Sequence, residues 1–292
     1  MLVFSSERLT KKSLAMKPEI VNISFKFNLP TGLAVDSTEN LYVVDSGNHR
    51  VLKFNKAGNQ IIEWGNFGTK NGEFNFYEDM GTVCGIAIDS QDNIFVVDKG
   101  NYRIQKFDSD GNFLTSWGSK GLADGQFIRP IYAASDAQGH VFVTDDRNPI
   151  VQKFDNHGKF LLKWGSLGDK DGQFKHATGI AADSEGSIYI SDYENERVQK
   201  FDNDGLFLAS WTTGVSGKSG TPEAIAIDHS DRIYITDSDL NQVVVFDKTG
   251  TSIKKIRLAR KGSPYGIAID TEGNLYISDR QNDRVMKYKV LI

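Results

Sequence analysis

The stretch GLAVDSTENLYVVD, residues 32–45, recurs five more times along the 292-residue chain. Its copies are GIAIDSQDNIFVVD (85–98), YAASDAQGHVFVTD (132–145), GIAADSEGSIYISD (179–192), AIAIDHSDRIYITD (224–237) and GIAIDTEGNLYISD (266–279). Two aspartates stand nine residues apart in every copy, and the second one falls at 45, 98, 145, 192, 237 and 279. Successive copies are therefore 42 to 53 residues apart, which is the signature of a repeat architecture.

Each complete unit has the pattern of four short strands. The first two are apolar, the third is of the type Arg103–Phe107, and the fourth is of the type Phe113–Trp117. Four strands per unit at this period are typical of a propeller blade, and six units predict six blades. The 28 glycines, 18 phenylalanines and 10 tyrosines agree with an all-β chain rich in turns. The expected fold is an all-β, six-bladed β-propeller of four-stranded blades.

The stretch FDSDGNF (107–113) resembles the start of a calcium loop, but between the strands its equivalents in other units share only the glycine. Glycine is what a tight hairpin needs where φ is positive, so we interpret these segments as hairpin turns. Each tryptophan follows such a glycine by six residues, which predicts packing between neighbouring blades. The four tryptophans are Trp64, Trp117, Trp164 and Trp211.

The last unit ends after three strands, so one blade lacks its outer strand. Phe27 and Pro30 match Phe127 and Pro130 in the approach to a first strand, and EIVNISFKF (19–27) precedes that point. We expect this amino-terminal segment to supply the missing strand and to close the ring. The domain prediction is an extension over residues 1–18 and a single propeller over 19–292.

Composition restricts the possible partners and surroundings of the chain. The net charge of −4 argues against a dedicated nucleic-acid binder. Cys84 is the only cysteine, which excludes an intrachain disulfide. The start, MLVFSSERLTKKSLAMKP, has too short an apolar stretch for a signal peptide, and no apolar run has the length of a membrane span. A cytoplasmic location without membrane attachment is the expectation.

Two paired motifs carry a family resemblance. PTGLAVD (30–36) is followed by DSGNHRVLKF (45–54), and PYGIAID (264–270) is followed by DRQNDRVMKY (279–288). The pattern resembles the NHL repeat family of six-bladed propellers over about residues 19–292. That resemblance implies an interaction platform, as in the substrate- or RNA-binding end of tripartite-motif ubiquitin ligases and in sensor domains of bacterial kinases. A related branch, the peptide-amidating lyases, holds a metal in the central channel.

Two further features of the repeat are interpreted as structural. Four loops between the second and third strands keep an aspartate, an asparagine three residues on and an arginine five residues on, as in Asp45, Asn48 and Arg50. We expect the charge pair to brace the loop. The recurring third-strand lysines are expected to be solvated outer residues. They are Lys53, Lys106, Lys153, Lys200 and Lys287.

The largest departure from the repeat is an insertion before blade two. Phe127 and Phe174 stand five residues before the first-strand position, whereas Phe74 stands eleven before Gly85. The six extra residues lie within 75–84 and are expected to expose Tyr77, Glu78, Asp79 and Met80. Aromatic and arginine side chains dominate binding hot spots. The predicted partner-binding residues are Tyr77, Glu78, Asp79, Lys99, Tyr102, Arg129, Tyr132, Asp146 and Arg147.

These observations favour a non-catalytic scaffold that binds a protein or peptide through the face bearing these loops, without a cofactor. The alternative is a metal-dependent lyase or hydrolase at the mouth of the central channel. For that alternative only His49 and His176 are expected on the loop face, and two histidines make a weak metal site. RNA binding is disfavoured because the loop residues mix both signs of charge.

Overall fold

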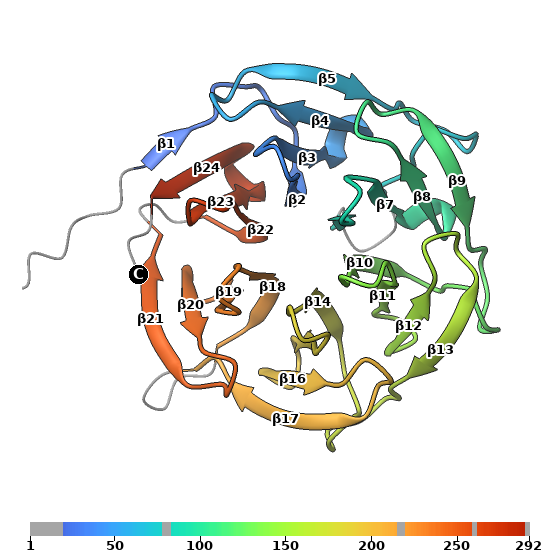
Figure 1. The fold of residues 1–292 in the computed structure, drawn as a ribbon, viewed down its shortest axis with the longest axis vertical. Helices are drawn as coiled ribbons and strands as arrows, with labels where there is room; N and C mark the ends of the chain where they lie inside the picture. Colours follow the sequence, from blue (N-terminus) through green and yellow to red (C-terminus); the bar gives the residue numbers. More distant parts are fainter. Residues whose placement is uncertain (1–19, 78–82, 215–219, 259–261, 290–292) are drawn as a thin grey trace, which may run out of the picture.

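A computed structural model describes residues 20–77, 83–214, 220–258 and 262–289 of the chain. Within these ranges the strands form six four-stranded antiparallel sheets around a central axis (Figure 1). The predicted all-β, six-bladed propeller is therefore confirmed. No helix in the described ranges is long and apolar enough to cross a membrane.

Blades one to five each use four consecutive strands. Blade one comprises β2 (Pro30–Val35), β3 (Leu41–Asp45), β4 (Arg50–Phe54) and β5 (Gln60–Trp64), and blade two comprises β6 (Ile86–Ile88), β7 (Ile94–Asp98), β8 (Arg103–Phe107) and β9 (Phe113–Trp117). Blade three comprises β10 (Pro130–Ser135), β11 (Val141–Asp145), β12 (Ile150–Phe154) and β13 (Phe160–Trp164). Blade four comprises β14 (Ala177–Ala182), β15 (Ile188–Asp192), β16 (Arg197–Phe201) and β17 (Phe207–Thr212), and blade five comprises β18 (Pro222–Ile227), β19 (Ile233–Asp237), β20 (Gln242–Phe246) and β21 (Ser252–Arg257).

Blade six combines strands from the two ends of the chain. It contains β22 (Pro264–Ile269), β23 (Asn274–Asp279), β24 (Arg284–Lys289) and, outermost, β1 (Ile20–Asn22). β1 pairs antiparallel with β24, and the N–H of Ile23 continues the ladder by donating to Val285 O at 3.1 Å. That this pairing holds the ring closed stays a prediction, and residues 1–18 lie outside the described ranges.

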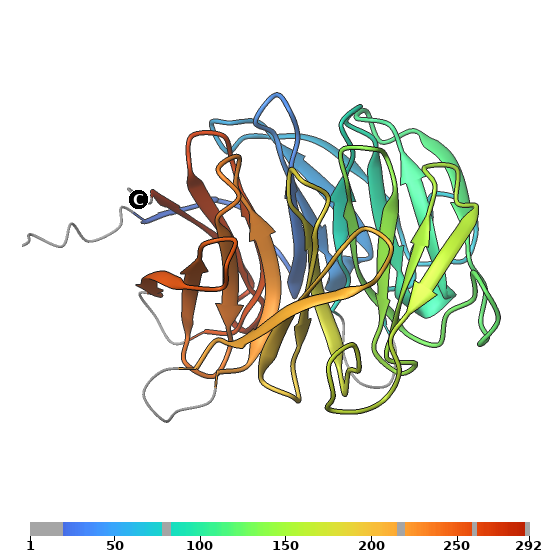
Figure 2. The same cartoon turned by 60° about the horizontal axis from the view of Figure 1, so that its bottom comes forward.

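The loops gather at the two ends of the strands (Figure 2). Pro30 at the start of β2 pairs with Asp45 at the end of β3, so loops leading into first strands share one end with loops between second and third strands. We call this end the loop face. It bears three short 3-10 helices, η1 (Ser46–Asn48), η2 (Lys99–Asn101) and η3 (Arg280–Asn282). The hairpins between third and fourth strands lie at the opposite end.

The first aspartate of each repeat builds a turn. Asp36 Oδ1 accepts the backbone N–H groups of Thr38 and Asn40 at 3.0 and 2.8 Å. Hydrogen bonds of this kind replace the ladder bonds that the backbone loses where it reverses. Equivalent bonds recur at Asp89, Asp136, Asp183, Asp228 and Asp270. The recurrence of this aspartate is therefore explained by turn formation.

Glycine recurs in the innermost strands because neighbouring blades approach closely there. The N–H of Gly32 donates to Cys84 O at 3.0 Å. A Cβ atom at Gly32 would lie 2.5 Å from that oxygen, and one at Gly266 would lie 1.9 Å from Thr31 O. Both distances are far below van der Waals contact, so a larger residue would push the blades apart.

The tryptophans pack between blades as predicted. The Trp164 ring lies 6.1 Å from Phe142 in its own blade and 5.8 Å from Phe201 in the next, in centroid distances. It also covers Gly205 in the next blade, where a Cβ would lie only 2.7 Å from the indole. Trp64 lies likewise between Tyr42 and Phe107, Trp117 between Phe95 and Phe154, and Trp211 between Tyr189 and Phe246.

The prediction of solvated third-strand lysines is wrong for blades one to three. Lys53, Lys106 and Lys153 are buried. The Lys106 ammonium lies 5.2 Å from the centre of the Phe95 ring and donates to Asn156 O in the next blade at 3.1 Å. Lys53 and Lys153 likewise donate to carbonyls in the hairpin of the following blade, so this hairpin and not solvent receives the ammonium groups.

Candidate functional site

The repeated aspartate–asparagine–arginine set braces the loops, as expected. Arg50 Nε donates to Asp45 Oδ2 at 2.9 Å, and Asn48 Nδ2 donates to the same oxygen at 2.8 Å. The sets in blades two, four and six repeat this ion pair. Because Asp45 is fully buried, the paired arginine and asparagine compensate its desolvation. These residues therefore have a structural role.

Blade three lacks the brace because Ile150 stands in the arginine place. Asp145 keeps the backbone bonds that braced aspartates also accept, here from the N–H groups of Ile128 and Arg129 at 2.6 and 2.9 Å. Burial raises the pKa of Asp145 to about 6, and the hydrogen bonds offset only part of that shift. The loop face thus departs at blade three from the pattern of the four braced loops.

The described start of the insertion is held on the loop of blade one. His49 Nδ1 accepts the backbone N–H of Phe76 at 3.1 Å, and the His49 ring lies 4.6 Å from Tyr77 and 5.0 Å from Phe67. Burial lowers the pKa of His49, which agrees with a neutral ring that accepts at this nitrogen. We call His49, Phe67 and Tyr77 the aromatic patch. Glu78, Asp79 and Met80 lie outside the described residues.

Two members of the aromatic patch, Phe67 and Tyr77, are exposed although both contact the buried His49 ring. Phe67 is 64% exposed and Tyr77 is 44% exposed. Tyr102 is half-buried in the next loop, with the Lys120 ammonium 4.8 Å from its ring centre. Arg147 is exposed in the corresponding loop of blade three. Of the predicted residues, Tyr77 and Arg147 thus reach the surface, and Tyr102 reaches it partly.

The other four predicted residues do not form an exposed surface. Lys99, Arg129, Tyr132 and Asp146 are each at most 8% exposed. Lys99 and Asp146 directly follow the aspartate that ends the second strand, while Arg129 and Tyr132 lie at the start of β10. Those positions face the inner part of the ring, where neighbouring blades cover them. The sequence placed these residues at the loop face but not at the right depth.

Asp146 is the centre of a buried ion cluster between blades three and four. Its carboxylate pairs with the Arg129 guanidinium, and its Oδ2 lies 2.7 Å from His176 Nε2. Burial alone would raise the pKa of Asp146, but the hydrogen bonds from His176 and Arg129 hold it below the usual value. The cluster therefore joins two blades by paired charges. His176 was expected on this face.

Tyr132 reaches across the axis of the propeller. Its hydroxyl donates to Tyr265 O at 2.7 Å, which links blade three to the opposite blade six (Figure 1). Four of the six blades have a glycine at the position of Tyr132, for example Gly32 and Gly179. This tyrosine therefore fills space that the repeat otherwise leaves to the backbone.

Glu223 in β18 is a buried titratable residue that the sequence analysis did not single out. Burial raises its pKa to about 8, the negative charge of Asp146 adds to the shift, and Arg280 opposes it. Within the described ranges its carboxyl group has no hydrogen-bond partner. Blades one and four have Thr31 and Thr178 at this position, so alignment of the repeats could have singled out Glu223.

A metal site was the basis of the catalytic alternative. Among the residues that the structure describes, no three His, Cys, Asp or Glu side chains come together in a way that could hold a metal ion. His176 and Asp146 are engaged with each other and with Arg129. The alternative therefore gains no ligand set from the described residues.

The repeat, the six blades and the braced loops can now be compared with known proteins. The profile of the NHL repeat matches residues 27–54, 85–107 and 174–201. These three segments match the NHL repeat, and the predicted resemblance is confirmed. NHL repeat-containing protein 3 of Homo sapiens is 32% identical over 113 residues. The match covers 37% of this chain and only 28% of that protein.

Solved structures with enzymatic names share the fold. A streptogramin B lyase superposes with a TM-score of 0.65 at 14% identity, covering 94% of this chain and 98% of the other. A gluconolactonase from Xanthomonas campestris superposes with a TM-score of 0.70 at 16% identity, covering 94% and 90%. At such identities the likeness concerns the fold alone, and one fold hosts many activities.

Proposed function

We propose that this propeller is a non-catalytic scaffold that binds a protein or peptide partner through its loop face, at the aromatic patch. The carrying observation is the exposure of Phe67 and Tyr77 while both rings are held against His49. Rings fixed in place lose little conformational freedom on binding, which is why aromatic side chains dominate hot spots. Arg147 and the Lys120–Tyr102 pair supply a polar rim.

The direct backbone contacts of the insertion support this proposal. Gly100 N donates to Asn75 O at 2.8 Å, and the Tyr77 hydroxyl donates to Gly47 O at 3.4 Å. The aromatic patch is therefore fixed to two blades at once. A surface that departs from the repeat and is rigidly held is the kind of place where a propeller carries its function.

The test compares two double variants in binding to a partner purified with the full chain. Phe67→Ser with Tyr77→Ser should weaken binding at least ~10-fold, because hot-spot truncations typically cost 2 kcal/mol or more. Ile61→Ser with Leu208→Ser removes two exposed apolar residues from outer strands and should leave the dissociation constant unchanged. Equal binding by both double variants, measured by biolayer interferometry, would refute the aromatic patch as the docking site.

A further inference from the structure

At the junction between blades six and one, the outer strand pairs with its neighbour in the same register as the outer strands that carry a tryptophan. In blade three, Trp164 pairs with Val151, the second residue of the third strand. The second residue of β24 is Val285, and its carbonyl accepts the N–H of Ile23 at 3.1 Å. Ile23 therefore stands where four other blades place a tryptophan. We call the junction between blades six and one the open junction.

The surroundings of an indole are present at the open junction. Tyr276 corresponds to Tyr42, and Phe54 of blade one corresponds to Phe107 of blade two. The hairpin glycine is Gly58, and a Cβ atom there would meet nothing within 4 Å. At Gly111, Gly158, Gly205 and Gly250, a Cβ would lie 2.5 to 2.9 Å from a tryptophan ring. Among the described residues, Gly58 thus lacks the tryptophan ring that covers the other four hairpin glycines.

A second substitution opens the same place. Gln60 pairs with Phe54, whereas the equivalent positions of blades two, three and four hold Phe113, Phe160 and Phe207, and that of blade five holds Ser252. Phe25 supplies one ring contact to Phe54, at 5.4 Å between centroids. Among the described residues no ring contacts Tyr276 from this side, whereas each tryptophan elsewhere contacts both of its aromatic neighbours.

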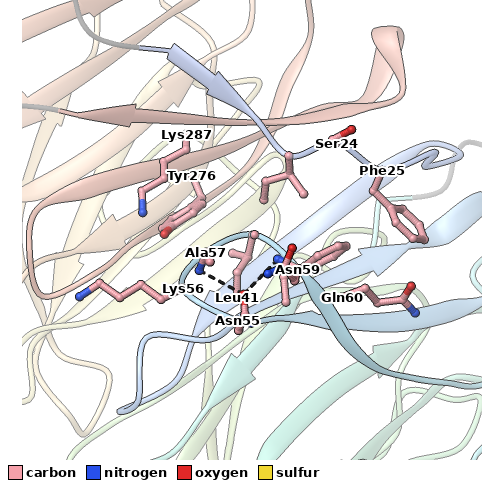
Figure 3. Close-up of a pocket in the computed structure, with 13 residues that line it drawn as sticks. Ser24, Phe25, Leu41, Asn55, Lys56, Ala57, Asn59, Gln60, Tyr276 and Lys287 are labelled. Carbon is pink, nitrogen blue, oxygen red and sulfur yellow. Dashed lines mark hydrogen bonds between the residues drawn. The ribbon is translucent and has the colours of Figure 1, made fainter.

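The result is a surface pocket of about 720 Å³, a volume typical of small-molecule sites. Figure 3 shows Tyr276 and Lys287 on one side, Phe25 on the other, and the hairpin residues Ala57 and Asn59 between them. Ile23 and Phe54 complete the apolar part of the lining. The pocket therefore lies between the rings of Tyr276 and Phe25 and borders the hairpin that contains Ala57 and Asn59.

Polar groups at the pocket are also less engaged than in the other junctions. Lys106 and Lys153 donate to hairpin carbonyls of the following blade at 3.1 and 3.0 Å. Lys287 makes no such bond within the described ranges, and its ammonium lies 3.6 Å from Asp270 Oδ2 and 4.9 Å from the centre of the Tyr276 ring. A ligand could therefore receive a hydrogen bond from Lys287 beside its ring.

We infer that the open junction binds a free small molecule that carries an indole-sized aromatic ring. The chain itself shows the fit, because four equivalent places are filled by indole rings with the same neighbours. β1 and Ile23 already pair with β24 beside the pocket, so a strand from a partner protein cannot pair with β24 there. The site is remote from the aromatic patch and does not depend on the proposed function.

Calorimetric titration of the full chain with indole tests this inference. The wild type should bind indole saturably, and Ile23→Trp should bind at least ~10-fold more weakly because its own ring fills the pocket. Ile61→Trp is the matched control, since Ile61 is exposed on β5 and the same substitution there leaves the pocket open. Gln60→Phe narrows the pocket from an exposed position, so it tests the site even if Ile23→Trp fails to fold.

The outcomes separate the possible occupants. Loss of indole binding in Ile23→Trp and Gln60→Phe, with normal binding by Ile61→Trp, supports the site. Wild-type binding retained in both pocket variants would overturn it. Binding of a tryptophan-containing peptide without binding of free indole would also overturn it, in favour of a peptide site. Indole binding that appears only after deletion of residues 1–18 would assign the pocket to that segment and overturn the free site.

Discussion

The junction between blades three and four and the open junction between blades six and one share a backbone register but differ in what fills them. Trp164 lies between Phe142 and Phe201 and covers a hairpin glycine. At the open junction Ile23 stands in the same register and a pocket remains. The same register thus gives a packed interface at Trp164 and a binding-sized pocket beside Ile23, whereas Ile256 in this register of blade five is buried.

The difference follows from how the ring is joined. In blades one to four the outer strand follows the third strand through a hairpin turn, so the turn fixes the register of the pair. In blade six the outer strand is three residues long and pairs across most of the chain, Ile20 with Tyr288. Such a long-range pairing must compensate loop-closure entropy with the contacts of a few residues. Ile23 and Phe27, just after β1, contribute buried side chains to these contacts.

Deletion of residues 1–27 should have the largest effect. It removes β1 together with the buried side chains of Ile23 and Phe27, so the free energy of unfolding should fall by more than about 5 kcal/mol. Urea unfolding followed by fluorescence measures the change. Deletion of residues 1–18 alone is the control and should leave the midpoint nearly unchanged. A 1–27 deletion that unfolds like the full chain would contradict a closing role for this segment.

Alanine substitutions at the two junctions should differ. Trp164→Ala leaves a large cavity between two blades and should cost about 3–5 kcal/mol of unfolding free energy. Ile23→Ala should cost about 2 kcal/mol, at the low end for isoleucine, because Ile23 already borders a pocket. Ile61→Ala, exposed on β5, should stay within about 0.5 kcal/mol of the wild type. Equal losses at Trp164 and Ile23 would show that both junctions are equally packed.

The sequence predicted the fold well because the repeat carries its own register. Six copies with aspartates at fixed spacing placed the turns, and the glycine-to-tryptophan interval placed the outer strands correctly. The repeated sequence pattern could not predict the pocket at the open junction. Ile23 has no hairpin glycine before it, so nothing local marks it as the equivalent of Trp164. Only the pairing with Val285 reveals the correspondence.

The candidate site was predicted only in part. The insertion and Tyr77 were visible as a change in spacing, and Tyr77 is exposed. Arg129 and Asp146 were predicted at the surface, but their depth depends on how the blades converge at the axis, which alternation along a strand does not encode. Glu223 could have been found by the rule that marks Tyr132, namely a large or charged residue where other blades have a small one.

The innermost strands also differ at one position of the repeat, where blade four has Thr178 and blade five has Glu223. Thr178 in blade four uses its hydroxyl to reach Glu223 O at 3.2 Å, which links two neighbouring blades. Glu223 occupies the same register in blade five, and its carboxyl group has no such bond within the described ranges. A buried carboxyl group without a partner favours its neutral form. The replaced residue thus makes the stability of this region depend on pH.

Glu223→Gln should therefore stabilise the protein only at higher pH. The pKa of Glu223 is about 8 in the folded state against a usual value of 4.5, so the folded state keeps a proton that the unfolded chain loses. Stability from this group is complete below about pH 4.5 and is lost as the pH rises towards 8. Glutamine has no such dependence, so at pH 7.5 the variant should be more stable than the wild type by roughly 4 kcal/mol.

Urea unfolding of both proteins from pH 4 to pH 8 measures this difference, which should vanish at the acidic end because both side chains are then neutral in both states. Asp169→Asn is the control, since Asp169 is an exposed carboxylate on a surface loop. A Glu223→Gln difference of constant size across the range would mean that glutamine changes packing and not protonation. A difference that grows as the pH falls would reverse the sign and place the charged form of Glu223 in the folded state.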